Sequence, residues 1–184
     1  MFHWVHKFLA VLGISISSAI AADGDAVRTF HDAVHVGKVE TVRTMLATEP
    51  GLATSRDEYG FQPVHLLDMY PDEKVLDLLL ANGADINASN DEGVTILHIV
   101  TDPDAVPLLV GRGANIEARD KRGWTPLITQ ANNQQNGPDV VAALLAHGAD
   151  PNAEGHNGET ALSFARETGD GSFIKVLTAN GATK

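Results

Sequence analysis

Two histidines on one predicted helix carry the most suggestive chemistry in this sequence. The string His31-Asp32-Ala33-Val34-His35 separates the two imidazoles by four residues, the spacing at which a helix can offer both to one zinc ion. A catalytic zinc site of this kind also needs a glutamate as general base beside the first histidine, and a third ligand. The acid here is the shorter Asp32. A metalloenzyme that uses His31 and His35 is therefore the least favoured hypothesis for the function.

Most other reactive sites are missing from the sequence. It contains no cysteine, which excludes disulfides, thiolate zinc sites and cysteine nucleophiles. It has no glycine-rich phosphate loop and no G-x-S-x-G elbow, since Gly111-Arg112-Gly113 fits the end of a helix. The formal net charge of −11, from 24 acidic and 13 basic residues, opposes binding to phosphate backbones and anionic lipids. We therefore expect no enzyme activity, no cofactor or metal, and neither nucleic acid nor, after signal cleavage, membrane as a partner.

The spacing of the histidines favours a structural role instead. His31, His65 and His98 are separated by 34 and 33 residues. A residue that returns at a nearly constant interval occupies one position of a repeating unit. With 184 residues, of which 43% are hydrophobic and 20% charged, the chain has enough apolar material for one folded domain built from such units.

Glycines mark the same interval along the chain. One set lies in a Gly-Ala-polar triplet and recurs about every 33 residues, and a second set precedes each predicted helix start at a similar interval. The first set is Gly83, Gly113, Gly148 and Gly181, and the second is Gly60, Gly93, Gly123 and Gly158. Two markers that keep step in this way indicate an internal repeat.

Each unit contains the signals of two consecutive helices. Thr125 and Thr160 are suited to cap a first helix, and Pro126 fits its first turn, where a missing amide hydrogen does no harm. A second helix is predicted over residues 75–80 and 140–145, where apolar residues fall at helical spacing. The glycine of the Gly-Ala-polar triplet then ends this helix, because glycine tolerates a left-handed backbone.

The pattern resembles the ankyrin repeat family, whose units start a helix with Thr-Pro-Leu-His and end one with Gly-Ala-Asp-x-Asn. The best matches are Pro63-Val64-His65 with Gly83-Ala84-Asp85-Ile86-Asn87, and Thr125-Pro126-Leu127 with Gly148-Ala149-Asp150-Pro151-Asn152. The resemblance implies an all-α solenoid of about five stacked helix-turn-helix units over residues 23–184. It also implies that the repeated histidine ties the helix start to the adjacent loop, and that the domain binds another protein.

Three units depart from the pattern. The first lacks the glycine loop and ends in Pro50-Gly51-Leu52, which suits an N-terminal cap. The third is short, so that its first helix must stop near Thr101 before Asp102-Pro103-Asp104. The fourth is long, with residues 132–137 between its helices. We expect these changes of length to form a notch at the third and fourth units.

The N-terminus has the order of a secretory signal peptide. Lys7 precedes an apolar run from Phe8 to Ala22, and Ala19-Ile20-Ala21 forms a small-residue cleavage pattern. The run is shorter than the roughly 20 apolar residues that cross a bilayer. We interpret residues 1–22 as a cleaved signal peptide, with an uncleaved anchor as the alternative. The mature chain is then periplasmic or secreted.

In ankyrin stacks a partner contacts the loop tips and the exposed face of each first helix, and this surface carries over to the chain by position. Tyrosine and tryptophan dominate binding hot spots, which favours Tyr59, Tyr70 and Trp124. An alternative is that Phe61 and Trp124 only pack on neighbouring loops. The predicted partner-binding residues are His35, Glu58, Tyr59, Phe61, Met69, Tyr70, Asp91, Glu92, Lys121, Arg122, Trp124, Asn132, Asn133, His156 and Asn157.

Two functions remain open for such a protein-binding module. The chain is either an adaptor or companion that stabilises or positions another exported protein, or an inhibitor, such as an immunity protein, that blocks a toxin or enzyme in the same compartment. A tight inhibitor needs a concentrated contact patch, whereas an adaptor can spread its contacts. In both cases we expect a monomer that binds another protein.

Overall fold

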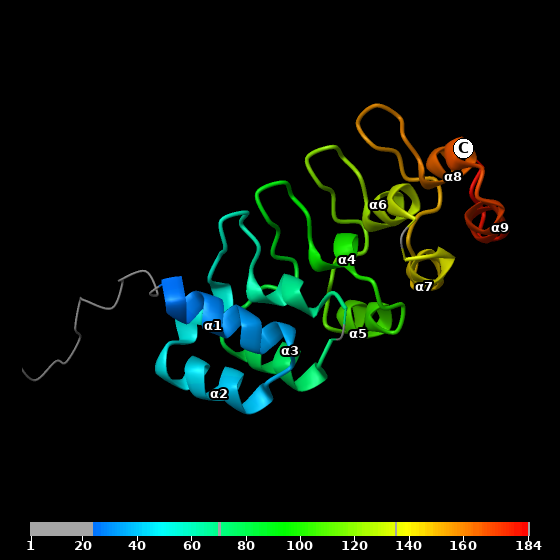
Figure 1. Cartoon of the computed structure of the whole chain (residues 1–184). Helices are drawn as coiled ribbons and strands as arrows, with labels where there is room; N and C mark the ends of the chain where they lie inside the picture. The colour runs from blue at the N-terminus through cyan, green and yellow to red at the C-terminus, as the bar shows by residue number, and fades with distance from the viewer. Residues whose placement is uncertain (1–23, 70, 135, 184) are drawn as a thin grey trace, which may run out of the picture.

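The computed structural model describes residues 24–69, 71–134 and 136–183, and places helices but no strand in them. This confirms the predicted all-α class. The helices form pairs, each made of a first and a second helix (Figure 1). The first helices are α1 (Gly24–His35), η2 (Pro63–Leu67), α4 (Ile96–Ile99), α6 (Pro126–Asn133) and α8 (Ala161–Thr168). The second helices are α2 (Val39–Thr48), α3 (Glu73–Ala81), α5 (Ala105–Gly111), α7 (Pro138–Ala146) and α9 (Gly171–Ala179), and a short 3₁₀ helix, η1 (Pro50–Thr54), follows α2.

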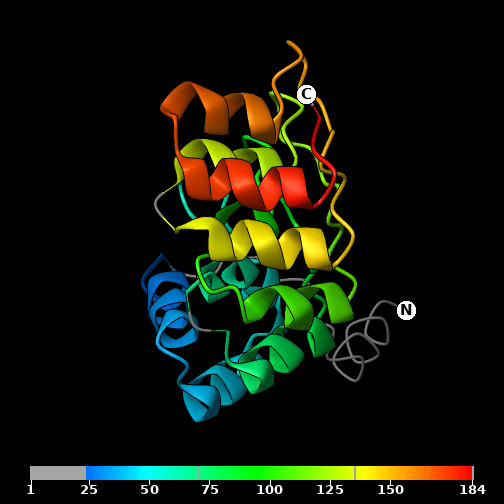
Figure 2. The same ribbon diagram turned by 90° about the vertical axis from the view of Figure 1, so that its right-hand side faces the viewer.

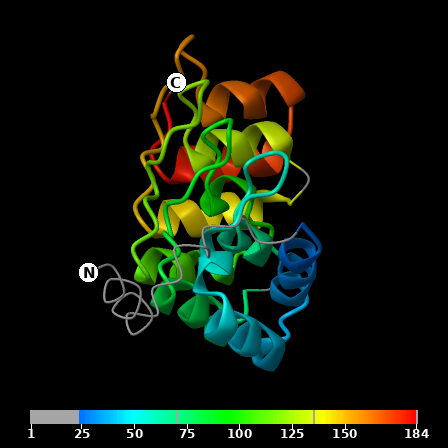
Figure 3. The same ribbon diagram turned by 90° about the vertical axis from the view of Figure 1, so that its left-hand side faces the viewer.

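The pairs stack so that the first helices form one row and the second helices another. Along the first row α1 packs on η2, η2 on α4, α4 on α6 and α6 on α8, while along the second row α2 packs on α3, α5 on α7 and α7 on α9. The loops that join consecutive pairs project from one side of the stack (Figures 2 and 3). We call these loops finger 1 (residues 55–62), finger 2 (88–95), finger 3 (118–125) and finger 4 (153–160). The predicted solenoid of helix-turn-helix units is therefore confirmed.

Local signals explain where the helices begin and end. At the start of α8, Thr160 Oγ1 accepts a hydrogen bond from the amide of Ser163 at 3.1 Å. After α3 the amide of Ala84 donates to the carbonyl of Leu79 at 3.0 Å, and the intervening Gly83 has a φ of +91°. Such a left-handed turn is costly for any residue with a Cβ atom. Equivalent glycines follow α5, α7 and α9, as the sequence predicts.

The first helices differ in length, and proline positions explain the difference. The 3₁₀ helix η2 has 5 residues and α4 has 4, whereas α6 and α8 have 8 each. Pro71 and Pro103 lie shortly after η2 and α4, and neither has the amide hydrogen that would extend a helix. The second and third units therefore have much shorter first helices than the fourth and fifth.

A buried glutamine in α6 satisfies the end of the short helix α4. The Gln130 side chain is 3% exposed, and its Nε2 donates to the carbonyl oxygens of His98 at 3.1 Å and Val100 at 2.8 Å. Its Oε1 accepts from Asn136 Nδ2 at 3.1 Å. The last carbonyls of a helix have no helical partner and must be satisfied from outside. Gln130 thus joins the half of the stack with short first helices to the half with long ones.

One continuous apolar core runs through the stack. It takes fully buried side chains from every pair of helices, from Phe30 of α1 to Phe173 of α9. A second, smaller cluster belongs to fingers 3 and 4 and the helices that follow them, and consists of Trp124, Ile128 and Ala153 with Phe164 packed against it. Fingers 3 and 4 therefore have an apolar support of their own.

The predicted signal peptide, residues 1–22, lies outside the described residues. Within residues 24–69, 71–134 and 136–183, no helix combines the length and the apolar character needed to cross a bilayer. The cleavage site and the anchor alternative stay predictions.

Candidate binding surface

One side chain at the base closes each of the first three fingers. In finger 1 Asp57 Oδ1 accepts from the amides of Tyr59 and Phe61, both at 2.9 Å, and the Asp57 amide donates to the Phe61 carbonyl at 3.0 Å. Asn90 and Asp120 make the equivalent bonds in fingers 2 and 3. Short polar side chains stabilise turns in this way. The repeated Asp or Asn is a turn signal that was not predicted from the sequence, in contrast to the glycine of each finger.

Finger 4 is closed differently, because Gly155 occupies the base position. The Glu159 carboxylate takes over and accepts from the backbone amide and the side-chain amide of Asn157, both at 3.0 Å. The hydrogen bond from the Asn157 side chain is the main cause that lowers the pKa of Glu159 below its ordinary value. A carboxylate from the far side of the turn thus replaces the missing Asp or Asn.

Backbone hydrogen bonds hold neighbouring fingertips in register. The amide of Lys121 donates to the carbonyl of Glu92 at 2.9 Å, and the amide of His156 donates to the carbonyl of Arg122 at 2.9 Å. The corresponding bond between fingers 1 and 2 is longer, at 3.5 Å. These bonds fix the positions of the fingertips, and of the side chains on them, relative to one another.

The repeated histidines brace the fingers from below. His65 is 1% exposed, its Nδ1 accepts from the amide of Gln62 at 3.0 Å, and its Nε2 lies 3.1 Å from the carbonyl oxygen of Val94 in finger 2. His98 repeats this arrangement with finger 3, where its Nε2 lies 3.1 Å from the carbonyl oxygen of Trp124. Both contacts suit a neutral imidazole with its proton on Nε2. Burial lowers the pKa of both histidines and so favours this neutral form.

His31 and His35 do not converge on a common site. His31 keeps the repeat position, and its Nε2 lies 3.0 Å from the side-chain Oγ of Ser55 at the start of finger 1. Burial lowers the pKa of His31. His35 faces a separate hollow and lies near Asp68, whose pKa is raised by burial. Across the part of the chain that the structure describes, no three His, Asp or Glu side chains are placed to hold a metal ion. The geometry therefore gives no support to a metalloenzyme that uses this pair.

Trp124 is packed into the base of finger 3 and not displayed at its tip. Its side chain is 8% exposed, and Phe164 meets it edge-on with ring centroids 5.0 Å apart. The guanidinium carbon of Arg122 lies 3.7 Å from the centre of the indole ring, while the same guanidinium pairs with Asp120 at 2.6 Å. Trp124 therefore packs on the neighbouring loop, as the alternative interpretation proposed. Burial between two units gives the ring more free energy than exposure at a tip would.

The other predicted contact residues divide by exposure. Phe61 is half-buried and meets the His65 ring edge-on at 5.3 Å. Tyr70 lies outside the described residues. The exposed ones are His35, Glu58, Tyr59, Met69, Asp91, Glu92, Lys121, Arg122, Asn132, Asn133, His156 and Asn157. Most of the predicted surface is thus open to solvent.

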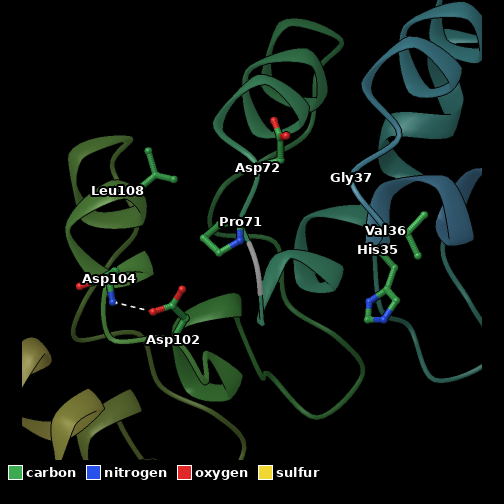
Figure 4. A pocket seen from close by; sticks show the side chains of 8 residues that line it. All are labelled: His35, Val36, Gly37, Pro71, Asp72, Asp102, Asp104 and Leu108. Atoms are coloured by element: carbon green, nitrogen blue, oxygen red, sulfur yellow. Dashed lines mark hydrogen bonds between the residues drawn. The ribbon is translucent and has the colours of Figure 1, made fainter.

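A hollow of about 620 Å³ opens at the turns between the first and second helices of the first three units (Figure 4). The predicted notch involved the third and fourth units, whereas the hollow lies among the first three. It forms there because η2 and α4 are both short. The prediction of a notch recognised a shortening in the third unit but not in the second. We call it the acidic hollow, and its lining residues are His35, Val36, Gly37, Pro71, Asp72, Asp102, Asp104 and Leu108.

Comparison with known proteins agrees with this architecture. A family model described as ankyrin repeats (3 copies) matches residues 68–154 and 97–184, which together make up well over half of the chain. The chain is also similar to the B-cell lymphoma 3 protein homolog of Mus musculus, with 32% identity over 160 residues. That alignment covers 81% of this chain and 35% of the relative, so the chain spans about a third of the length of the curated relative.

Proposed function

Because the chain belongs to the ankyrin repeat family and is therefore a protein-binding module, we propose that it is an exported adaptor or companion of another exported protein. It holds that protein on the fingertips and on the ends of the first helices. The anchor of the contact lies in the first two units.

The position of the exposed apolar side chains carries this proposal. Among the described residues the large hydrophobic side chains exposed to solvent are Val36 at 59%, Tyr59 at 65% and Met69 at 44%. All three belong to the first two units, although the stack contains apolar residues throughout. Tyr59 lies at the tip of finger 1, whereas Val36 lines the hollow at the helix turns, so the first two units offer exposed apolar groups at two places that a partner could contact. Tyrosine is also among the residues that contribute most to binding hot spots.

Export is supported by the leader-like order of residues 1–22 and by the absence of cysteine, which avoids mispaired disulfides in an oxidising compartment. Fractionation of the native cell tests this part of the proposal. The chain is expected in the envelope or outside the cell, with an N-terminus after Ala21 or Ala22. Recovery of the full-length chain in the cytoplasm would contradict it.

Co-purification of the tagged chain from the native envelope fraction tests partner binding. The double variant Tyr59→Ala with Met69→Ala should lower recovery of the captured protein by roughly tenfold or more, because each removes an exposed contact of the hot-spot kind. A matched control, Lys74→Ala with Lys175→Ala, changes exposed residues of the second helices and should leave recovery unchanged. Equal recovery with both variants, at unchanged circular dichroism, would contradict an anchor in the first two units.

An inhibitor is the second candidate, because the exposed apolar residues are concentrated and not spread along the stack. The two functions differ in what the captured protein does in the complex. If the captured protein is an enzyme or toxin, one equivalent of the purified chain should abolish its activity. Full activity of the captured protein in the saturated complex would contradict the inhibitor hypothesis and favour the adaptor.

A further inference from the structure

We propose that the acidic hollow binds a lysine or arginine side chain of the partner polypeptide. The inference rests on the proposed function, since it names the chemistry of one contact in the same complex. It assigns a chemistry to the contact at the ends of the first helices, where the turns to the second helices begin.

The carboxylates of the hollow have oxygens free to accept from a cation. Asp72 Oδ1 caps α3 by accepting from the amides of Lys74 at 2.8 Å and Val75 at 3.1 Å, which leaves Oδ2. Asp102 Oδ1 accepts from the amide of Asp104 at 2.9 Å, as Figure 4 shows. Among the described residues, none of these three carboxylates forms an ion pair with a basic side chain. Three negative charges thus line one concavity, and no described lysine or arginine pairs with them; the lining also contains His35.

The spread of these carboxylates favours a long organic cation over a metal ion. Asp72 stands on a different unit from Asp102 and Asp104, with Pro71 between them in Figure 4. Calcium and magnesium require several oxygen ligands within roughly 2.0–2.6 Å of one point. The described part of the chain contains no such group of ligands. A guanidinium or ammonium group has several N–H donors and can address carboxylates that do not converge.

Apolar walls complete the hollow and fit the stem of the same side chain. Val36, Pro71 and Leu108 line it beside the carboxylates. Lysine and arginine pack their aliphatic stems on apolar surface while the charged head reaches polar groups. The volume of about 620 Å³ lies within the roughly 300–1,000 Å³ of typical ligand sites, and so accommodates the side chain together with the adjoining backbone.

A short peptide tests the proposal without knowledge of the partner. The probe is the blocked peptide Gly-Ser-Leu-Arg-Leu-Ser-Gly, titrated into the isotope-labelled full chain while backbone amide shifts are followed by NMR. We expect saturable shifts at residues 35–37, 71–72 and 102–108. The same peptide with citrulline in place of arginine keeps the shape but not the charge, and should bind at least roughly tenfold more weakly.

Matched variants separate the hollow from the overall negative charge. The hollow variant carries Asp72→Asn, Asp102→Asn and Asp104→Asn, because asparagine can still accept the bonds that Asp72 and Asp102 accept from backbone amides. It should weaken the arginine peptide at least roughly tenfold, while the control variant should change binding by less than about twofold. The control carries Asp85→Asn, Asp139→Asn and Asp150→Asn, which removes the same charge outside the hollow.

Each other result would overturn the proposal. Equal weakening by both variants would mean general electrostatic attraction, and equal binding of the citrulline peptide would mean a purely apolar contact. Shifts confined to the fingertips would show that the hollow is not the binding site for the peptide. Protein binding by the fingers would still stand, and the Tyr59 and Met69 variant tests it separately. Displacement of the peptide by Mg²⁺ at constant ionic strength, with shifts at the same residues, would mean a metal site. If the hollow variant does not fold, the citrulline comparison on the unchanged chain still decides.

Discussion

The two halves of the stack use the same repeat in different ways. In the C-terminal half α6 and α8 are complete first helices, and Trp124 and Phe164 fill the space at the base of fingers 3 and 4. In the N-terminal half η2 and α4 are short, the acidic hollow opens at the helix turns, and Val36, Tyr59 and Met69 are exposed. The comparison teaches that units with complete first helices fill the space at the base of their fingers, whereas units with short first helices leave a hollow and apolar side chains open to solvent.

Removal of the apolar support of the C-terminal half should have the largest effect on stability. Trp124→Ala truncates a ring that is 8% exposed, and truncation of a buried aromatic side chain costs about 3–5 kcal/mol of unfolding free energy. Urea unfolding measures the loss. Tyr59→Ala, at a ring that is 65% exposed in the N-terminal half, is the matched control and should change stability by less than about 0.5 kcal/mol. Equal losses for the two variants would break the distinction between the halves.

Disruption of the junction between the halves should have the next largest effect. Gln130→Met keeps the size of the side chain but removes the donor to the carbonyl of His98 and leaves that of Val100 with only the longer bond from Asn136 at 3.4 Å, which should cost about 2–3 kcal/mol. Hydrogen exchange should then quicken in α4 before α8. Gln134→Met removes a bond to Thr168 in a more exposed place and should cost less than about 1 kcal/mol. If Gln130→Met melts like the unchanged chain, the junction does not depend on this side chain.

Acidification should weaken the N-terminal half first. Burial lowers the folded-state pKa of His65 and His98 below the ordinary 6.5, which the unfolded chain retains. Above pH 6.5 the histidines are neutral in both states and their contribution is complete. As the pH falls below that value, only the unfolded state takes up protons, so the unfolding free energy falls until the pH passes the lowered folded-state pKa. Linkage limits the loss to about 1.4 kcal/mol per pH unit for each histidine.

The C-terminal half lacks this pH dependence at the same positions, which hold Ile128 and Ser163. Hydrogen exchange at about pH 5.5 should therefore show loss of protection in η2, α4 and their fingers before α6 and α8. The double variant His65→Gln with His98→Gln should be less stable at neutral pH but show a flatter pH dependence. An unchanged slope would mean that these histidines do not titrate on unfolding.

Loss of a surface ion pair should have the smallest effect. Arg56 pairs with Asp91 at 2.8 Å across fingers 1 and 2, and both side chains are largely exposed. Arg56→Met should lower the unfolding free energy by less than about 1 kcal/mol, because solvent screens such pairs. Exchange of the amides in fingers 1 and 2 should quicken slightly, since their backbone bond is already long. A larger loss of stability would show that finger 1 depends on this pair.

The sequence predicted those structural features that depend on residues within a single repeat unit. The helix end at Gly83 and the cap at Thr160 follow from the conformation and hydrogen bonds of single residues, and both are confirmed. The burial of Trp124 was open, because Phe164 reaches it from the next unit. The role of Gln130 was missed, since its acceptors lie a full repeat earlier in the chain.

The acidic hollow was not predicted, for a similar reason. The sequence showed that the third unit is short, but Pro71 shortens the first helix of the second unit without changing the length of the repeat. A count of residues between glycines therefore could not reveal it. The sequence signal that could have revealed the hollow is a proline next to aspartate at equivalent helix turns, in Pro71-Asp72 and Asp102-Pro103-Asp104. The partner-binding residues and the export of the chain remain predictions.

A hydrogen-exchange footprint of the chain with its co-purified partner tests most directly whether the partner contacts the N-terminal half of the stack and not the C-terminal half. The account predicts that binding protects amides in residues 31–37, 57–72 and 102–108, while finger 4 and the helices α8 and α9 exchange as in the free chain. Protection centred on finger 4 and α8, or spread evenly over every unit, would contradict it.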